Sequence, residues 1–96
     1  MRLRTQAQRD MARIADAVEA IRVRLVEARE KGAVWKIVHA AMGRANRKNP
    51  SSAKARALRQ RWEAAREAKW AAEARVWRAQ ARLETLLLTL SDRGKR

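Results

Sequence analysis

The sequence contains no cysteine, which excludes disulfides, thiol chemistry and cysteine-based zinc sites. Its single histidine, His39, lacks the companions that a metal site or a catalytic triad requires, and no glycine-rich phosphate loop is present. The acidic residues stand at salt-bridge spacings and form no isolated pair suited to acid–base catalysis. We therefore expect a protein that is not an enzyme and that has no metal, no cofactor and no small-molecule substrate.

Long apolar runs are also missing. The longest, Leu86–Leu88, is far too short to span a bilayer. Arg2 and Arg4 are followed by Gln6 and further polar residues, where a signal peptide would have an apolar core. We expect a cytoplasmic protein of bacterial, phage or plasmid origin and no membrane partner; binding of a basic amphipathic helix to anionic lipid is a minor alternative.

Glycine and proline are scarce, with 3 and 1 residues, and phenylalanine and tyrosine are absent. The dominant residues are alanine, arginine, leucine and glutamate, all of which favour helices. No alternation typical of strands is bounded by turn residues. The sequence therefore predicts an all-α protein, with a single helical domain over residues 1–96.

Three helices are predicted, over residues 3–31, 33–45 and 52–91. Gly32 favours a break after the first helix, because glycine commonly closes a helix C-terminus; a kink in a continuing helix is the alternative. Asn49 and Pro50 mark the main turn, since a residue before proline is biased away from helix. Ser51 or Ser52 is expected to cap the last helix.

Apolar residues at alternating steps of three and four predict coiled-coil-like seams. The seam of the first helix is Met11, Ile14, Val18, Ile21, Leu25 and Ala28. The seam of the last helix is Ala55, Leu58, Trp62, Ala65, Lys69, Ala72, Val76, Ala79, Leu83, Leu86 and Leu90. These seams predict a long antiparallel helical hairpin, or an elongated three-helix bundle if Gly32 breaks the chain sharply. Either buries little core for its length, so we expect a homodimer or a larger protein complex.

Acidic residues are absent between Lys31 and Trp62, although this stretch holds nine cations. The whole chain has 24 Lys and Arg against 10 Asp and Glu, a net charge of +14. Such a patch attracts a polyanion, and nucleic acid is the commonest one in a cell. The predicted contacts flank a basic turn at residues 44–52: Lys36, Arg44, Arg47, Lys48, Ser51, Ser52, Lys54, Arg56, Arg59 and Arg61. A short basic tail is predicted at residues 92–96.

A second set of residues on the last helix is a candidate partner interface: Trp70, Trp77, Arg75, Arg78 and Arg82. The arginines lie beside the seam, where they could pair with acids of the first helix or follow a phosphate backbone. The two tryptophans lie off the seam. They could pack inside the protein, form a protein interface or stack on unpaired bases. Arg66, one turn before Trp70, is placed to stack on it.

The sequence thus predicts a small, basic accessory protein that binds the phosphate backbone of DNA or RNA with little sequence specificity. The alternative is a protein-interaction module: an inhibitor, adaptor or small subunit that docks on a larger nucleic-acid-handling complex. In size and composition the chain is similar to small basic subunits of CRISPR effector complexes and to small phage anti-defence (anti-CRISPR) proteins. No motif of either type is present. Exposure of both Trp70 and Trp77 would favour this alternative.

Overall fold

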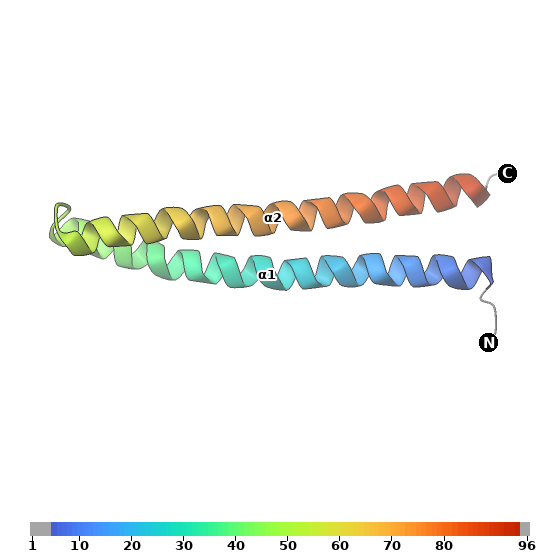
Figure 1. The fold of residues 1–96 in the computed structure, drawn as a ribbon, viewed down its shortest axis with the longest axis horizontal. Coiled ribbons are helices and arrows are strands. Elements are labelled where there is room, and N and C mark those ends of the chain that lie inside the picture. The colour runs from blue at the N-terminus through green and yellow to red at the C-terminus, as the bar shows by residue number, and fades with distance from the viewer. Residues whose placement is uncertain (1–4, 95–96) are drawn as a thin grey trace.

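The computed structural model describes residues 5–94, and it consists over that range of two long helices, α1 (Gln6–Lys48) and α2 (Ala53–Gly94). They run antiparallel beside each other and are joined by one short turn (Figure 1). The hairpin measures 67 × 30 × 14 Å. Its radius of gyration is 21.2 Å, compared with about 12.5 Å for a compact domain of this length. The predicted all-α class and the hairpin are confirmed, and the three-helix bundle is not.

The predicted break at Gly32 is wrong. Helix α1 continues through it, so the separate helix expected over residues 33–45 does not exist. Gly32 keeps a negative φ, and its backbone therefore does not close the helix. The physical reason lies further along, where Trp35, Val38 and Met42 are half-buried on the face of α1 that packs on α2. This packing offsets the cost of a glycine inside a helix, roughly 0.5–1 kcal/mol.

The helix ends are set by local caps. Thr5 and Gln8 form a capping box at the start of α1, a pattern that the sequence contains as Thr-x-x-Gln. Helix α1 ends at Lys48, three residues beyond its predicted end, and Asn49 is its extended C-cap. Ser52 accepts a hydrogen bond from the backbone N–H of Ala55 at 3.0 Å, which confirms it as the cap of α2.

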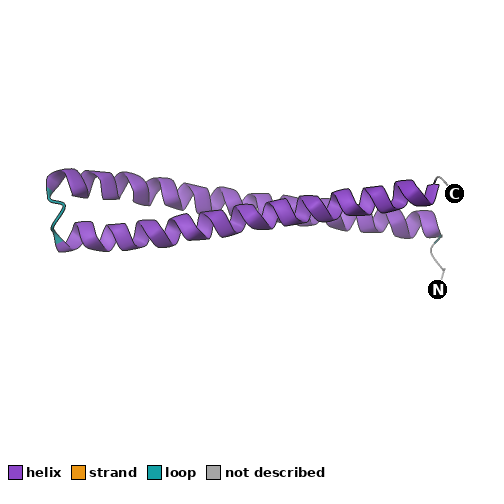
Figure 2. Cartoon of the chain, turned by 90° about the horizontal axis from the view of Figure 1, so that it is seen from above, coloured by secondary structure: helices purple, strands orange, loops and turns teal. Residues whose placement is uncertain are grey.

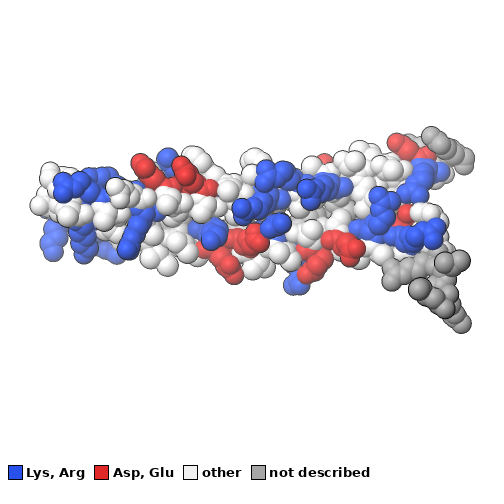
Figure 3. Space-filling model, in the orientation of Figure 1, with Lys and Arg blue, Asp and Glu red and all other residues white. Residues whose placement is uncertain are grey.

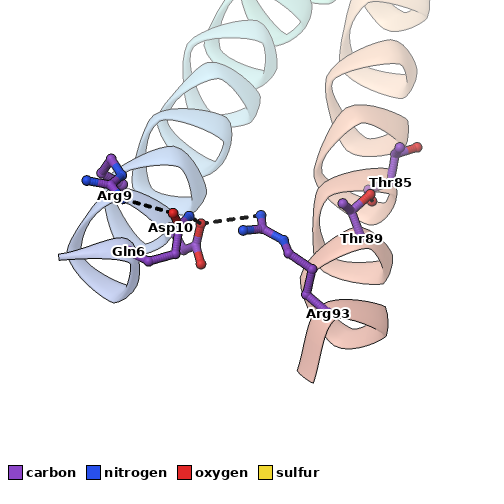
Figure 4. A network of polar contacts seen from close by, with 6 residues as sticks. All are labelled: Gln6, Arg9, Asp10, Thr85, Thr89 and Arg93. Carbon is purple, nitrogen blue, oxygen red and sulfur yellow. Dashed lines mark hydrogen bonds and ion pairs between the residues drawn. The ribbon is translucent and has the colours of Figure 1, made fainter. Parts of the chain in front are cut away.

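The free ends of the two arms are joined by one polar contact. Arg93 reaches from α2 to Asp10 of α1, with 3.5 Å between Nη2 and Oδ1 (Figure 4). Arg93 belongs to the predicted basic tail at residues 92–96, but residues 92–94 are the last turn of α2. The rest of that tail, Lys95 and Arg96, lies outside the described residues, as do positions 3 and 4 of the first predicted helix.

The seam predicted for α2 is confirmed, because each of its residues is buried or half-buried. Four of them are buried: Ala55, Ala72, Val76 and Ala79. Alanine at facing positions lets helix axes approach closely. No large side chain among the described residues is fully buried, so the core between the arms is thin.

The seam predicted for α1 is half wrong. Ile14, Ile21 and Ala28 are half-buried as expected, but the alternate positions Met11, Val18 and Leu25 are exposed. Their place toward α2 is taken by the residues one position earlier, namely Asp10, Ala17 and Arg24, which are all half-buried. This rotation allows α1 to form two ion pairs with α2: Asp10 with Arg93, and Glu27 with Arg75.

Candidate nucleic-acid interface

The turn between the helices is held by hydrogen bonds from two of the predicted phosphate-binding arginines. Arg59 Nη1 donates to the Asn46 side chain at 2.8 Å and to the Pro50 carbonyl at 3.0 Å. Arg56 Nη1 donates to the Ser51 carbonyl at 3.1 Å. Because these guanidinium groups donate hydrogen bonds to carbonyl oxygens of the turn, they fix its shape. They still contribute their positive charge to the surface around it.

A basic hollow opens between the ends of the two helices. It has a volume of about 620 Å³, and cations from both helices line it: Arg44 and Lys48 from α1, and Lys54 from α2. Its remaining lining is Ala41, Ala45, Asn49, Ser52 and Leu58. We call the surrounding end of the hairpin, residues 41–61, the tip. The structure thus gathers four of the predicted contacts in one place, since Ser52 is among the lining residues.

The remaining predicted contacts are spread around the tip. Arg47 and Arg61 are exposed, and an atom of the Arg47 guanidinium lies 3.5 Å from where a Cβ on Gly43 would be. Ser51 is exposed, and its backbone N–H donates to the side chain of Asn49 at 3.1 Å. Lys36 is exposed but lies outside the tip and does not line the hollow.

The charge of the tip is uncompensated. Within residues 5–94, every ion pair lies on the arms: Arg22–Glu19, Arg24–Glu27, Lys69–Glu73, Arg75–Glu27 and Arg93–Asp10. On the arms, hydrogen bonds from Arg22 hold the pKa of the Glu19 carboxyl below its ordinary value. The tip has seven cations and no acid. Figure 3 shows the result, with Lys and Arg but no Asp or Glu at the tip end.

Contacts between the helices define two sides of the hairpin. On one side Glu27 pairs with Arg75, with 3.8 Å between the charged atoms. Lys48, Lys54 and Arg82 are heptad equivalents of these residues and flank the same side of the seam. We call it the arginine side. The basic hollow at the tip lies here, as does a second hollow lined by arginines, and the side follows the seam as the helices wind past each other (Figure 2).

The second hollow lies midway along the arms. It has a volume of about 240 Å³ and is lined by Ala20, Ala79 and four arginines: Arg24, Arg75, Arg78 and Arg82. We call it the arginine hollow. Glu27 pairs with Arg24 and Arg75, whereas Arg78 and Arg82 have no acidic partner among the described residues. Of the three arginines that could pair with acids of the first helix, Arg75, Arg78 and Arg82, only Arg75 does so among the described residues.

The opposite side of the seam carries the aromatic residues. Trp62 Nε1 donates to His39 Nδ1 at 2.9 Å, and the His39 ring stacks on Trp35 with 4.9 Å between centroids. The predicted stacking of Arg66 on Trp70 is confirmed, with the guanidinium 4.8 Å from the ring centroid. Trp70 is nevertheless 55% exposed, and Trp77, one heptad later, is 71% exposed.

Comparison with protein-family models, curated proteins and solved structures finds no match to this chain. Its function therefore has to be inferred from its own geometry and charge. Among the described residues, no helix is long and apolar enough to cross a membrane.

The sequence did not reveal every residue of these hollows. Ala41, Ala45 and Leu58 line the tip hollow but were not among the predicted contacts. Arg24 lines the arginine hollow from α1, although the predicted seam placed Leu25 there instead. The heptad repeat could have identified Arg24, because it lies seven residues after Ala17 and seven before Lys31, so these three residues share one line on α1.

Proposed function

We propose that this protein binds the phosphate backbone of nucleic acid at its tip. The observation that carries the proposal is the combination of seven cations, no acid and a basic hollow at one tip. Arg44 and Lys48 come from one helix and Lys54 from the other, so the cations face the ligand from two directions. Because the Arg59 bonds fix the turn, little conformational entropy is lost when a phosphate binds.

The proposed binding has little sequence specificity. Lys and Arg supply the sequence-independent electrostatic term that dominates non-specific binding. The neutral donors at the tip, such as Ser51 and Asn49, are of the kind that contact sugar and phosphate. Asn46, the other amide of the turn region, is half-buried and accepts a hydrogen bond from Arg59. Base recognition by a dedicated helix is therefore not part of the proposal.

The test is a salt series with labelled duplex and single-stranded oligonucleotides. Five tip cations make no hydrogen bond or ion pair with another described residue: Arg44, Arg47, Lys48, Lys54 and Arg61. They predict a log–log slope of about −4.5 for a short duplex that reaches the tip alone and about −3.5 for a short single strand. The variant Arg44→Glu/Arg47→Glu/Lys48→Glu should abolish binding and keep its helicity by circular dichroism. Unchanged affinity in that variant would refute the tip as the site, and a shallow slope in the wild type would refute backbone binding.

A second candidate function is protein interaction, and the exposure of both Trp70 and Trp77 favours it. Exposed tryptophans at the surface of a helix are typical anchors of protein interfaces. The proposed partner is a second copy of the chain or a larger complex that handles nucleic acid. This candidate is compatible with the first, because the tryptophans lie on the arms and the uncompensated cations lie at the tip.

A further inference from the structure

An apolar strip follows the side of the hairpin opposite the arginine side. Asn46 and Arg59 are hydrogen-bonded across this side, so their heptad equivalents also flank it. On α1 these equivalents, the α1 line, are Met11, Val18, Leu25, Gly32 and His39, and the first three are the residues that the predicted seam wrongly turned toward α2. On α2 the equivalents, the α2 line, are Arg66, Glu73, Gln80 and Leu87, of which only Leu87 is an exposed large hydrophobic residue. We call this face the apolar side.

The tryptophans widen the same face. Trp70 and Trp77 are each four residues after a member of the α2 line, Arg66 and Glu73, and such pairs are neighbours on a helix surface. The contact of Arg66 with both Trp62 and Trp70 shows this adjacency directly. No large hydrophobic residue is exposed between Ile37 and Trp70, so the apolar side stops short of the tip.

The molecule exposes more surface than its mass requires. Its accessible area is 7801 Å², whereas a compact monomer of this mass has about 5,600 Å². The excess is about 2,200 Å². An obligate homodimer buries about 2,000–5,000 Å² in total, or about 1,000 Å² or more per copy. The range of about 2,000–5,000 Å² corresponds to about 1,000–2,500 Å² per copy, and the excess of this chain falls within it.

The charges at the edges of the apolar side are self-complementary. The α1 edge carries Arg22, Arg29 and Lys36, each four residues after a member of the α1 line. The corresponding α2 edge carries Glu63 and Glu84 around the two tryptophans. Opposite signs on the two edges of one face favour a second copy in which α1 meets α2, because each cationic edge then lies against an acidic one.

We propose that two copies of this chain associate through their apolar sides, with α1 of each on α2 of the other, to form a four-helix bundle. This deepens the second proposed function. The two-fold axis runs along the arms, so both tips lie at the same end. The ion pair Glu27–Arg75 shows which residues of α1 and α2 lie at the same height along the long axis. In the proposed dimer both copies have the same heights. Arg22 of one copy and Glu84 of the other then lie about 6 Å apart along the axis, at 1.5 Å rise per residue, which is within side-chain reach.

The first test compares two matched substitutions on α1 by sedimentation velocity. Leu25 and Val23 are 40% and 45% exposed and lie two residues apart, but only Leu25 is on the apolar side. Leu25→Glu should give a monomer of 11.0 kDa, whereas Val23→Glu should remain a dimer like the wild type. A monomeric wild type at about 100 μM, or equal effects of the two substitutions, would overturn the proposal.

The second test uses charge exchange and does not depend on a core substitution that could impair folding. Arg22→Glu/Arg29→Glu and Glu63→Lys/Glu84→Lys should each weaken the homodimer at least tenfold. An equimolar mixture should restore a dimer, because the exchanged edges are again complementary between the two variants. Failure of the mixture to associate would overturn the α1-on-α2 arrangement. Both tests are made without nucleic acid, so their outcome is independent of the tip.

Discussion

Duplex length should decide whether the arginine hollow takes part in nucleic-acid binding. Lys54 at the tip and Arg78 in the hollow are 24 residues apart along α2, which is about 36 Å at 1.5 Å per residue. One turn of B-DNA repeats after about 34–36 Å. A duplex of about 20 base pairs is about 68 Å long and reaches both places, whereas one of about 8 base pairs, about 27 Å long, reaches only one.

The expected effect follows from the number of phosphate contacts. The variant Arg78→Gln/Arg82→Gln removes the two arginines of the hollow that have no acidic partner among the described residues. Each lost contact makes the log–log salt slope about 0.9 shallower, so on the long duplex the slope should change by about 1.8. Between about 50 and 200 mM salt the wild type should therefore lose about 12-fold more affinity than the variant.

Fluorescence anisotropy with both duplexes provides the measurement, and the short duplex is closed by a loop so that it stays paired. On the short duplex the wild type and the variant should have the same slope, because the tip alone binds it. Equal changes on both lengths would mean that the arginines act only through net charge. No change on either length would mean that the hollow does not touch the ligand, and the reasoning from spacing would be refuted.

Two further predictions concern stability and are best measured by thermal unfolding in the Leu25→Glu background, where self-association is removed. Gly32→Ala should raise the free energy of unfolding by about 0.5–1 kcal/mol, because Gly32 is inside a helix and an added Cβ meets nothing within 4 Å; a lower melting temperature would show that the helix does break there. Trp62→Ala should lower the free energy of unfolding by about 2–3 kcal/mol, because Trp62 is a half-buried seam residue that is hydrogen-bonded to His39. Trp70→Ala should lower it by only about 0.5–1 kcal/mol, through the loss of the contact with Arg66. Equal losses would place Trp70 in the core.

The seam of α2 could be predicted because every seam position except Lys69 is apolar, so only one choice of heptad positions fits the sequence. The seam of α1 could not, because the line of residues that packs beside Ile14 and Ile21 is less hydrophobic than the line on their other side. Met11, Val18 and Leu25 form the more hydrophobic line, yet the structure turns Ala17 and two polar residues toward α2. Sequence hydrophobicity therefore identified a real apolar line but assigned it to the wrong neighbour.

The remaining differences have the same origin. Gly32 is a local stop signal, and tertiary packing of the residues after it overrides that signal. At the tip the charge and the turn were readable from the sequence, because both are local properties of residues 41–61. The hollow was not, because residues of both helices line it, and its shape depends on how the two arms pack against each other.

The two proposals are thermodynamically linked through the charge of the chain. A net charge of +14 per copy opposes association, and it does so most strongly when two tips lie at the same end. A polyanion that bridges both tips removes that repulsion, so it should bind the dimer more tightly than the monomer. Reciprocity then requires nucleic acid to strengthen dimerisation by the same factor. The Leu25→Glu monomer should accordingly bind a duplex more weakly than Val23→Glu, although both carry the same charge and the same tip.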